Sequence, residues 1–529
     1  MKVNKLFLSA AVILGLGFTG CSNDDDVPSG EKGNTNVSVT LKMSAGSQTK
    51  ALPTDYNYIG EWAGKDDIKT VTVYLVDGSS VTSKSLEVGA SGSGKDYEKI
   101  VSGSDITLVP KTVNAAIKTT AGTKKVYVLV NGTTEVLNKL AKTPVAEFED
   151  AYTKLPFKSE NSGTMTTVST SADKLAVKNG TTDEKIVMTN VEPMTIDVLP
   201  NVTDTETLDG TAPKNRVRLN VERAVARVMV STAATTYIVP AAGGAPLGEI
   251  SDIRWELAQG ENSLYIQRKA DYATPNFGFI PADASAYAAQ AGEKYDYSGL
   301  FENYVADFGG TPVATIADYA ENTRFDKVTE ELNTKLSGKF ILPTTHKYGA
   351  GAASDYKKGN TAYVLIRAKF KPAPAAFADR LAYTPGADFF VGANGKFYTT
   401  AANAVDPATG GVTGQSVAKY VKGKVLYYAW VNPDAVPAWY NSPVIRNNVY
   451  HIHITGFKNL GTNWNPLYPE DPNSLSPKNP DPKPSVPGVT EPENPIVPTD
   501  PLTTSETWMS VDVKVLPWKL HSYSVAPGI

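Results

Sequence analysis

Histidine is scarce in this chain, yet two of its four copies stand two residues apart. His451 and His453 lie in a run rich in β-branched and aromatic residues. Side chains two apart on a strand share a face, as two ligands of one metal would. A structural zinc site needs four ligands, and no third and fourth ligand stand at a suitable spacing. We therefore predict no metal site and no cofactor, and the role of the pair stays open.

Cysteine chemistry is limited to one residue. Cys21 is the only cysteine, so no disulfide can form within the chain. No G-x-S-x-G elbow, phosphate-binding loop or dinucleotide-binding glycine pattern follows a predicted strand. Carboxylate pairs stay open as a source of acid–base chemistry, because 55 acidic residues form many pairs by chance. The sequence predicts that the chain is not an enzyme.

Cys21 ends a segment that is organised as an export signal. Basic Lys2 and Lys5 precede an apolar run over residues 6–17, and small residues precede the cysteine. The run is short for a membrane span, which makes an uncleaved anchor helix the weaker alternative. We expect residues 1–20 to be a signal peptide.

The residues around Cys21 resemble a bacterial lipobox, with Phe18 where leucine is commoner. This resemblance implies that Cys21 is acylated and becomes the N-terminus of an outer-membrane lipoprotein precursor. The run Asp24–Asp26 resembles the acidic tag of surface-exposed lipoproteins, and a solvated acidic run is the alternative.

Composition and charge restrict the partners. A formal net charge of -4 with 20% charged residues provides no large basic surface. Binding to a phosphate backbone depends on such a surface, so we predict no nucleic-acid partner.

Short strands separated by turn-rich connections dominate the sequence after Val71. Few helices are expected: Val328, Leu332 and Leu336 indicate one, and the apolar residues at 136, 137 and 140 indicate another. The pattern predicts a mainly β chain of two antiparallel β-sandwich domains with a few short helices. We place these domains at residues 51–220 and 221–465.

Two strands of matching pattern lie near the two ends of the chain. Each alternates four apolar residues with polar ones, the pattern of a half-buried strand. The first is in a prosegment over residues 21–50, and the second is in a C-terminal segment over residues 508–529. The alternating residues are Val37, Val39, Leu41 and Met43 in the first, and Met509, Val511, Val513 and Val515 in the second.

Proline separates the second strand from the domains. Twelve of the 36 residues from Pro466 to Pro501 are proline. Proline removes a backbone donor and fixes φ, so this segment is excluded from a sheet interior. We predict a semi-rigid, extended spacer over residues 466–507, with a reach on the order of 100 Å in a polyproline II conformation.

Because the two strands share the same apolar alternation, both are candidates for the same groove in a β-sandwich. Removing the first by proteolysis would expose unpaired backbone groups, and the second strand of a neighbouring molecule would pair with them. The donor and acceptor lie at different places on the chain, so the contact extends into an open filament.

Several longer runs resemble the fimbrillins of Bacteroidia, in particular the main subunits of short (minor) fimbriae. These runs are Tyr58 to Lys65, Val221 to Arg227, Gly359 to Phe370, Lys419 to Trp430, Arg446 to Ile454, and Val513 to Ser522. The resemblance implies transthyretin-like domains completed by strand exchange, in a subunit of a cell-surface fimbrium that supports adhesion and biofilm formation. Implied partners are copies of itself, accessory anchor and tip proteins, and host or bacterial surface receptors.

The resemblance also implies trimming of the prosegment by a gingipain-type maturation protease. Family members are typically cut after arginine, but the first arginine here is Arg216. We therefore predict cleavage between Lys50 and Ala51 by a lysine-specific enzyme. Lys42 is the competing site, and pairing of its strand should shield it.

Other functions remain as alternatives. An anchor or tip protein of the same fimbria would fit the sequence, and an anchor would retain its lipid and prosegment. A monomeric surface lipoprotein that binds glycan or a host protein is the third reading. Aromatic residues would supply its platform, although core packing is favoured for them. They are Trp430, Trp439, Tyr440 and Trp464.

Overall fold

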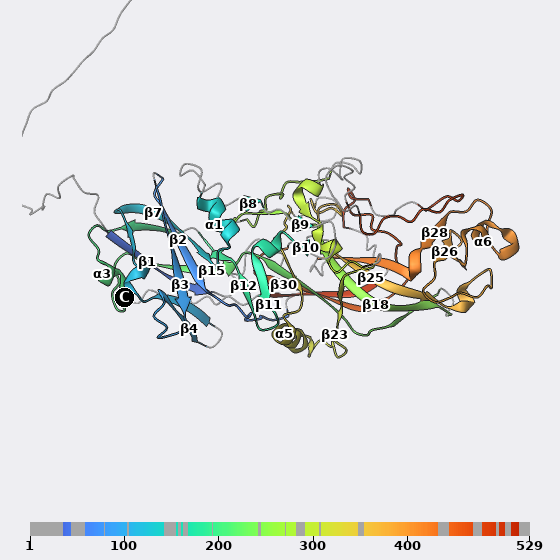
Figure 1. Ribbon diagram of the computed structural model, residues 1–529, viewed down its shortest axis with the longest axis horizontal. Helices are drawn as coiled ribbons and strands as arrows, with labels where there is room; N and C mark the ends of the chain where they lie inside the picture. Colours follow the sequence, from blue (N-terminus) through green and yellow to red (C-terminus); the bar gives the residue numbers. More distant parts are fainter. Residues whose placement is uncertain are drawn as a thin grey trace, which may run out of the picture.

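The computed structural model describes residues 35–43 and 59–517, apart from 79, 103–104, 142–154, 157–159, 162–167, 193, 242–244, 270, 282–290, 306–307, 348–353, 432–443, 469–478, 493–496 and 503–508. The molecule is elongated, with one group of strands at each end of its long axis (Figure 1). The strands around β1 lie at one end, and those around β26 and β28 lie at the other.

The first group forms a sheet in the order β13-β15-β1-β5-β4-β3-β2-β7-β14, with β6 beside β1. Because β13 also pairs with β7, the sheet closes on itself. Its strands are β1 (Thr35–Met43), β2 (Thr70–Val76), β3 (Val81–Gly89), β4 (Tyr97–Ser102), β5 (Asp105–Pro110), β6 (Ile117–Thr119), β7 (Gly122–Val130), β13 (Met188–Asn190), β14 (Met194–Val198) and β15 (Arg216–Arg223).

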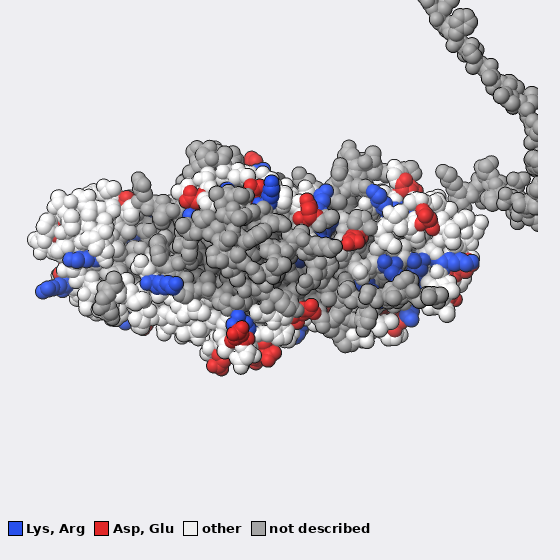
Figure 2. Space-filling view, turned by 180° about the vertical axis from the view of Figure 1, so that it is seen from behind, with Lys and Arg blue, Asp and Glu red and all other residues white. Residues whose placement is uncertain are grey.

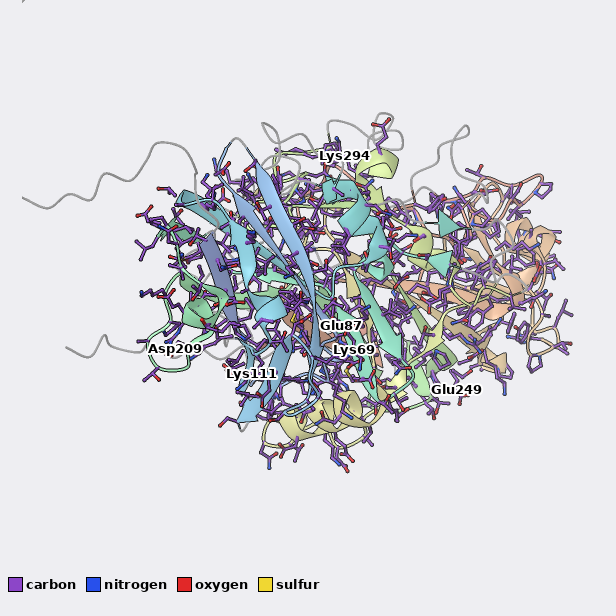
Figure 3. All side chains as sticks on the ribbon, turned by 60° about the vertical axis from the view of Figure 1, so that its left-hand side comes forward. Lys69, Glu87, Lys111, Asp209, Glu249 and Lys294 are labelled. Atoms are coloured by element: carbon purple, nitrogen blue, oxygen red, sulfur yellow. The ribbon has the colours of Figure 1, made fainter. Side chains whose placement is uncertain are left out.

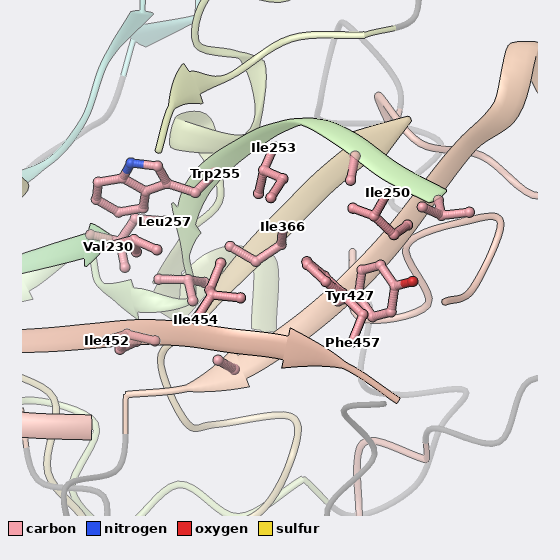
Figure 4. Close-up of a cluster of buried hydrophobic side chains, with 14 of the residues drawn as sticks. Val230, Ile250, Ile253, Trp255, Leu257, Ile366, Tyr427, Ile452, Ile454 and Phe457 are labelled. Carbon is pink, nitrogen blue, oxygen red and sulfur yellow. The ribbon is translucent and has the colours of Figure 1, made fainter. Parts of the chain in front are cut away.

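Two sheets in the second half of the chain face each other. One contains β16 (Ala226–Thr232), β23 (Ala314–Thr315), β24 (Lys339–Ile341), β30 (Asn448–Phe457) and β31 (Met509–Pro517). The other contains β17 (Tyr237–Pro240), β18 (Pro246–Ala258), β22 (Thr311–Pro312), β25 (Tyr363–Pro372) and β29 (Lys424–Trp430). Side chains of β18 such as Ile250 and Trp255 pack with Ile452, Ile454 and Phe457 of β30 in one buried cluster (Figure 4).

Smaller elements complete the molecule. A three-stranded sheet contains β26 (Phe389–Gly392), β27 (Phe397–Tyr398) and β28 (Val417–Tyr420). Paired short strands are β8 (Leu155–Pro156) with β20 (Ser263–Leu264), β9 (Glu160–Asn161) with β10 (Val168–Ser169), β11 (Ala176–Asn179) with β12 (Asp183–Ile186), and β19 (Gly260–Glu261) with β21 (Tyr295–Asp296). The helices are α1 (Thr134–Ala141), α3 (Asp204–Leu208), α5 (Arg324–Lys335) and α6 (Ala401–Val405).

The mainly β composition and both predicted helices are confirmed. Helix α5 buries Val328 and Leu332, whereas Leu336 is its C-cap and has a positive φ of 50°. Most strand pairs are antiparallel, but the expectation of antiparallel domains is wrong for some pairs, because β1 runs parallel to β15 and β16 runs parallel to β30. A parallel pair needs a long connection between its strands, and each of these pairs is joined by well over a hundred residues.

The two halves meet where β15 ends and β16 begins. The predicted boundary at residues 220/221 lies inside β15, and the next strand, β16, already belongs to the other half. Another buried cluster, which includes Val225, Leu264 and Val328, lies between the halves.

The proline-rich segment differs from the prediction of a free spacer. In its described part, Asp481 is fully buried and pairs with Arg367 and Lys424. Backbone hydrogen bonds also join Gly359 N to Pro498 O and Val417 N to Thr490 O. The described part of the segment lies outside the sheets, as its prolines require. It packs against the second half through buried side chains such as Asp481 and Val486.

Surface charge agrees with the composition. On the face shown in Figure 2, basic and acidic side chains of the described residues are interspersed, without a broad area of one sign. Among the described residues, no helix is both long and apolar enough to cross a membrane.

Candidate functional site

Strand β1 fills a groove between strands that are distant in sequence. It pairs in parallel with β15 from Ser38↔Arg216 to Met43↔Val221. On its other side, its first residues pair antiparallel with β6 and its last three pair antiparallel with β5. Both backbone edges of β1 are therefore engaged by the same chain.

The apolar residues predicted for this strand line the core. Val37, Val39 and Leu41 are fully buried, and Met43 is 5% exposed. They belong to one cluster with residues of β2, β7 and β15. Ser38 and Thr40 on the opposite face are also buried, so the expectation of a half-buried strand is wrong at these two positions.

Helix α3 and its flanking loops cover that opposite face. The Ser38 hydroxyl donates to Thr207 O at 2.7 Å, and Arg216 Nε donates to the Ser38 oxygen at 3.0 Å. Thr203 caps α3 in a capping box with Glu206, which fixes the helix start. Figure 3 shows Asp209, which follows α3, at the same end of the molecule.

Further hydrogen bonds hold the first residues of β1. The Thr35 hydroxyl donates to Leu199 O at 2.6 Å and accepts from Val202 N at 3.1 Å. Asn215 Nδ2 donates to Asn36 O at 3.1 Å. In the core, the Tyr97 hydroxyl donates to Val39 O at 2.7 Å, and burial raises the pKa of Tyr97.

A vacant groove would present all these groups without partners. Backbone donors and acceptors of β15, β5 and β6 would lose their partner strand, and the Tyr97 hydroxyl would lose its acceptor. The apolar side chains that pack on Val37, Val39 and Leu41 would also become accessible to water, which is unfavourable. A groove of this kind has a strong requirement for another strand.

Two arginines border the groove on β15. Arg216 is partly exposed, and its Nη2 is buried without a hydrogen-bond partner. Burial and the nearby Arg218 lower the pKa of Arg216. Arg218 is exposed and is the register partner of Thr40.

The second predicted strand forms β31, which pairs with β30 of its own chain. The pairing is antiparallel, from Asn448↔Pro517 to Phe457↔Met509, so Val511 and Val513 are register partners of Ile454 and Ile452. Among the described strands, β31 is the last of its sheet. The structure therefore does not bring Met509, Val511, Val513 and Val515 to the β1 groove of the same molecule.

The processing and lipidation residues are not placed. Cys21, Lys50 and Ala51 lie outside the described residues, so their predicted roles stay predictions.

The two histidines lie in β30 and are buried. Ser231 Oγ lies 2.7 Å from His451 Nε2 and 2.7 Å from His453 Nδ1, and the Tyr319 ring stacks on His453. Burial lowers the pKa of His451 to about 3. Within the described part of the chain, no group of three or more His, Cys, Asp or Glu is arranged to hold a metal.

The aromatic residues are described only in part. Trp430 is partly exposed and packs edge-on against Tyr363, and Trp464 is also partly exposed. Trp439 and Tyr440 lie outside the described residues.

Sequence reasoning missed the residues that hold β1 from outside its strand, namely Tyr97, Thr207, Asn215 and Arg216. No local pattern marks them, because their partners stand 58 to 180 positions away in the chain. The one available signal concerned Arg216. It alternates with Arg218 along one strand, and the uncharged Val217 stands between them.

Comparison with known proteins places this architecture in a family. Two proteins of Porphyromonas gingivalis, both described as minor fimbrium subunit Mfa1, are 32% identical to the chain over 99% of its length and 100% of theirs. The chain belongs to the fimbrillin family. The family model "Major fimbrial subunit protein type IV, Fimbrillin, C-terminal" matches residues 418–524, which include β30 and β31 of this fimbrillin.

Solved structures of related description also align with this fimbrillin. A putative cell adhesion protein from Parabacteroides distasonis has a TM-score of 0.41 and 11% identity, covering 92% of this chain and 100% of that one. A fimbrilin (fimA) from Porphyromonas gingivalis has a TM-score of 0.36 and 15% identity, covering 92% and 99%.

Proposed function

We propose that this fimbrillin is the polymerising structural subunit of a cell-surface fimbrium. Its membership of a family of fimbrial subunits supports a structural, non-enzymatic role at the cell surface. The observation that carries the polymerisation step is the groove filled by β1, which is enclosed on both edges by strands of the same chain.

Assembly proceeds in three steps in this proposal. The precursor is exported, acylated at Cys21 and displayed as an outer-membrane lipoprotein. A gingipain-type protease cuts after Lys50, and the segment containing β1 leaves the groove. Strand β31 of a neighbouring subunit then leaves β30 and occupies the vacant groove, completing one of two β-sandwich domains.

The energy of burial is sufficient for a durable junction. Four aliphatic side chains buried at about 1.5–3 kcal/mol each contribute roughly 6–12 kcal/mol before ordering costs. The net stability of a whole domain is about 5–15 kcal/mol. Because the groove and the donor strand lie in different halves of the molecule, repeated exchange gives an open filament.

Partners follow from this role. Copies of the chain form the shaft, and accessory anchor and tip proteins end it. The mature fimbrium supports adhesion to host or bacterial surfaces and biofilm formation.

N-terminal sequencing and intact mass of the surface-assembled protein test this function, beside a variant truncated before Trp508. A mature start at Ala51, with loss of oligomers on truncation, is the expected result. A start at acylated Cys21 with a monomer unaffected by truncation would contradict it.

A further inference from the structure

The two exchange strands match in more than their apolar alternation. Aligning Met509 with Val37 places identical residues at four of the nine positions of β1, and three of these four are polar. These identities are Thr507 with Thr35, Ser510 with Ser38, Val511 with Val39, and Lys514 with Lys42.

The matched polar residues are those that the groove holds by hydrogen bonds. Thr35 contacts Leu199 O and Val202 N, and Ser38 contacts Thr207 O and Arg216 Nε. A strand with threonine and serine at these positions repeats these bonds. Trp508 at the Asn36 position is the departure, because tryptophan lacks the amide that Asn36 donates to Val202 O.

The residue that differs in charge is Asp512. In this alignment it takes the place of Thr40, whose register partner is Arg218. Between Thr35 and Met43, β1 has no carboxylate, and Arg216 Nη2 is buried without a hydrogen-bond partner. Asp512 therefore brings a negative charge to the edge of the groove where two arginines adjoin each other.

Only two placements keep all four apolar residues of β31 in the four apolar positions of β1. In the reversed direction, Lys514 would replace Ser38 and lie beside its register partner Arg216. Like charges in register on neighbouring strands are destabilising. In the same direction, Ser510 replaces Ser38 and Lys514 replaces Lys42, whose register partner is the uncharged Asn220.

We propose that β31 of a second copy enters the groove in the direction of β1, parallel to β15, with Ser510 at the position of Ser38 and Asp512 beside Arg218. The carboxylate makes the incoming strand electrostatically better suited to the groove than the strand it replaces. This inference rests on the proposed strand exchange and specifies its direction, register and specificity-determining residues.

Disulfide trapping in fimbriae assembled by the full chain tests the direction. The double variant Asn220→Cys/Lys514→Cys should give a ladder of disulfide-linked oligomers on a non-reducing denaturing gel. Cysteines on neighbouring strands in register are close enough to bridge. Each single variant controls for chance pairing and for Cys21.

The matched double variant Arg216→Cys/Lys514→Cys traps the reversed strand. A ladder with this pair alone would overturn the proposed direction while leaving polymerisation intact. A disulfide confined to monomers, or no disulfide in filaments that truncation before Trp508 abolishes, would overturn the register. Filaments that survive the truncation would instead contradict the proposed function.

Charge exchange tests the specificity residues. Asp512→Lys should lower the assembled fraction by about two- to fivefold, the range for a partly exposed ion pair. Adding Arg218→Asp should restore assembly, and the size-matched Asp512→Asn should give a smaller loss than Asp512→Lys. Equal assembly by all three variants, with unchanged thermal unfolding of the unassembled precursor, would overturn the role of Asp512.

Discussion

Buried arginines connect distant parts of this fimbrillin. Arg223 pairs with Asp66 and Arg227 pairs with Glu184 near the junction of the two halves, with all four side chains fully buried. A buried pair often adds little net stability, but removing one partner leaves an uncompensated charge. Loss of any one of these four side chains should therefore destabilise the fold strongly.

Asp481 fixes the proline-rich segment to the second half by such a pair. Its carboxylate accepts from Arg367 Nη2 at 2.7 Å and from Lys424 Nζ at 2.9 Å. Asp481→Asn removes the nearest counter-charge of both buried cations and leaves Arg367 with Glu256 at 3.8 Å. We expect the free energy of unfolding to fall by about 3–5 kcal/mol. Urea denaturation of the precursor measures this.

The control variant is Glu491→Gln in the same segment, where Lys483 Nζ lies 3.5 Å from the carboxylate and both side chains are partly exposed. A loss below about 1 kcal/mol is expected there. Burial opposes ionisation of Asp481, but Arg367 and Lys424 hold its pKa below the ordinary value. The stability it contributes is thus present above about pH 4 and is lost as the pH falls through its lowered pKa.

For Glu261 we expect folding stability to depend on pH in the opposite direction. Burial raises its pKa to about 8, although hydrogen bonds from Thr274 and Asn276 favour the ionised form. The folded chain keeps a proton that the unfolded chain releases near pH 4.3, so stability falls as the pH rises from about 4 to 8.

Glu261→Gln removes this titration. Between pH 5 and pH 8, the wild type should lose about 1 kcal/mol or more of unfolding free energy relative to the variant. Parallel urea titrations at the two pH values measure the difference. If the wild type and the variant differ in unfolding free energy by the same amount at pH 5 and at pH 8, a raised pKa of Glu261 is contradicted.

At the scale of elements, strands were predictable where their signal is local. The alternation of Val37, Val39, Leu41 and Met43 predicted β1, and the same pattern predicted β31. The partners of these strands were not predictable, because β15 and β30 are joined to them by long intervening segments. The docking of Asp481 was also missed, since proline content reports local stiffness and not distant ion pairs.

The alternation of β31 predicts which substitutions block assembly. Val513→Asp places a charge at the position that Leu41 occupies in the groove core, and burial of an unpaired charge is strongly unfavourable. We expect this variant to form no filaments. The neighbouring Lys514→Ala, whose counterpart Lys42 is only partly buried, should assemble at nearly the wild-type level.

Filament length by electron microscopy and the oligomer ladder measure this difference. Equal loss in the two variants would contradict an alternating contact. Because Val513 is also the register partner of Ile452 in β30, thermal unfolding of the unassembled variant is measured alongside.

At the scale of the whole molecule, the β1 groove and strand β31 lie in different halves of an elongated body (Figure 1). Closing a sheet on itself removes exposed edges, so the precursor has no free edge at β15 or β5 while β1 is present. In the proposed assembly, removal of β1 converts this protected form into one that requires a partner strand. Processing of one short segment would then control when subunits associate.

A synthetic peptide of residues 507–517 should substitute for the neighbouring subunit. The precursor cleaved after Lys50 and freed of β1 should unfold at a lower temperature than the intact precursor. Added peptide should raise this temperature with concentration, because a ligand at a hundred times its Kd stabilises the folded state by about 2.7 kcal/mol. The intact precursor, whose groove is filled, should not respond.

The control peptide carries aspartate in place of Val511 and Val513, the residues that correspond to the fully buried Val39 and Leu41. It keeps the length and most of the sequence but loses the core contacts, so it should leave the unfolding temperature unchanged. Equal stabilisation by both peptides would mean that binding does not use the groove. A cleaved chain that is as stable as the precursor without any peptide would mean that β1 is dispensable, and that the groove exerts no demand for a second strand.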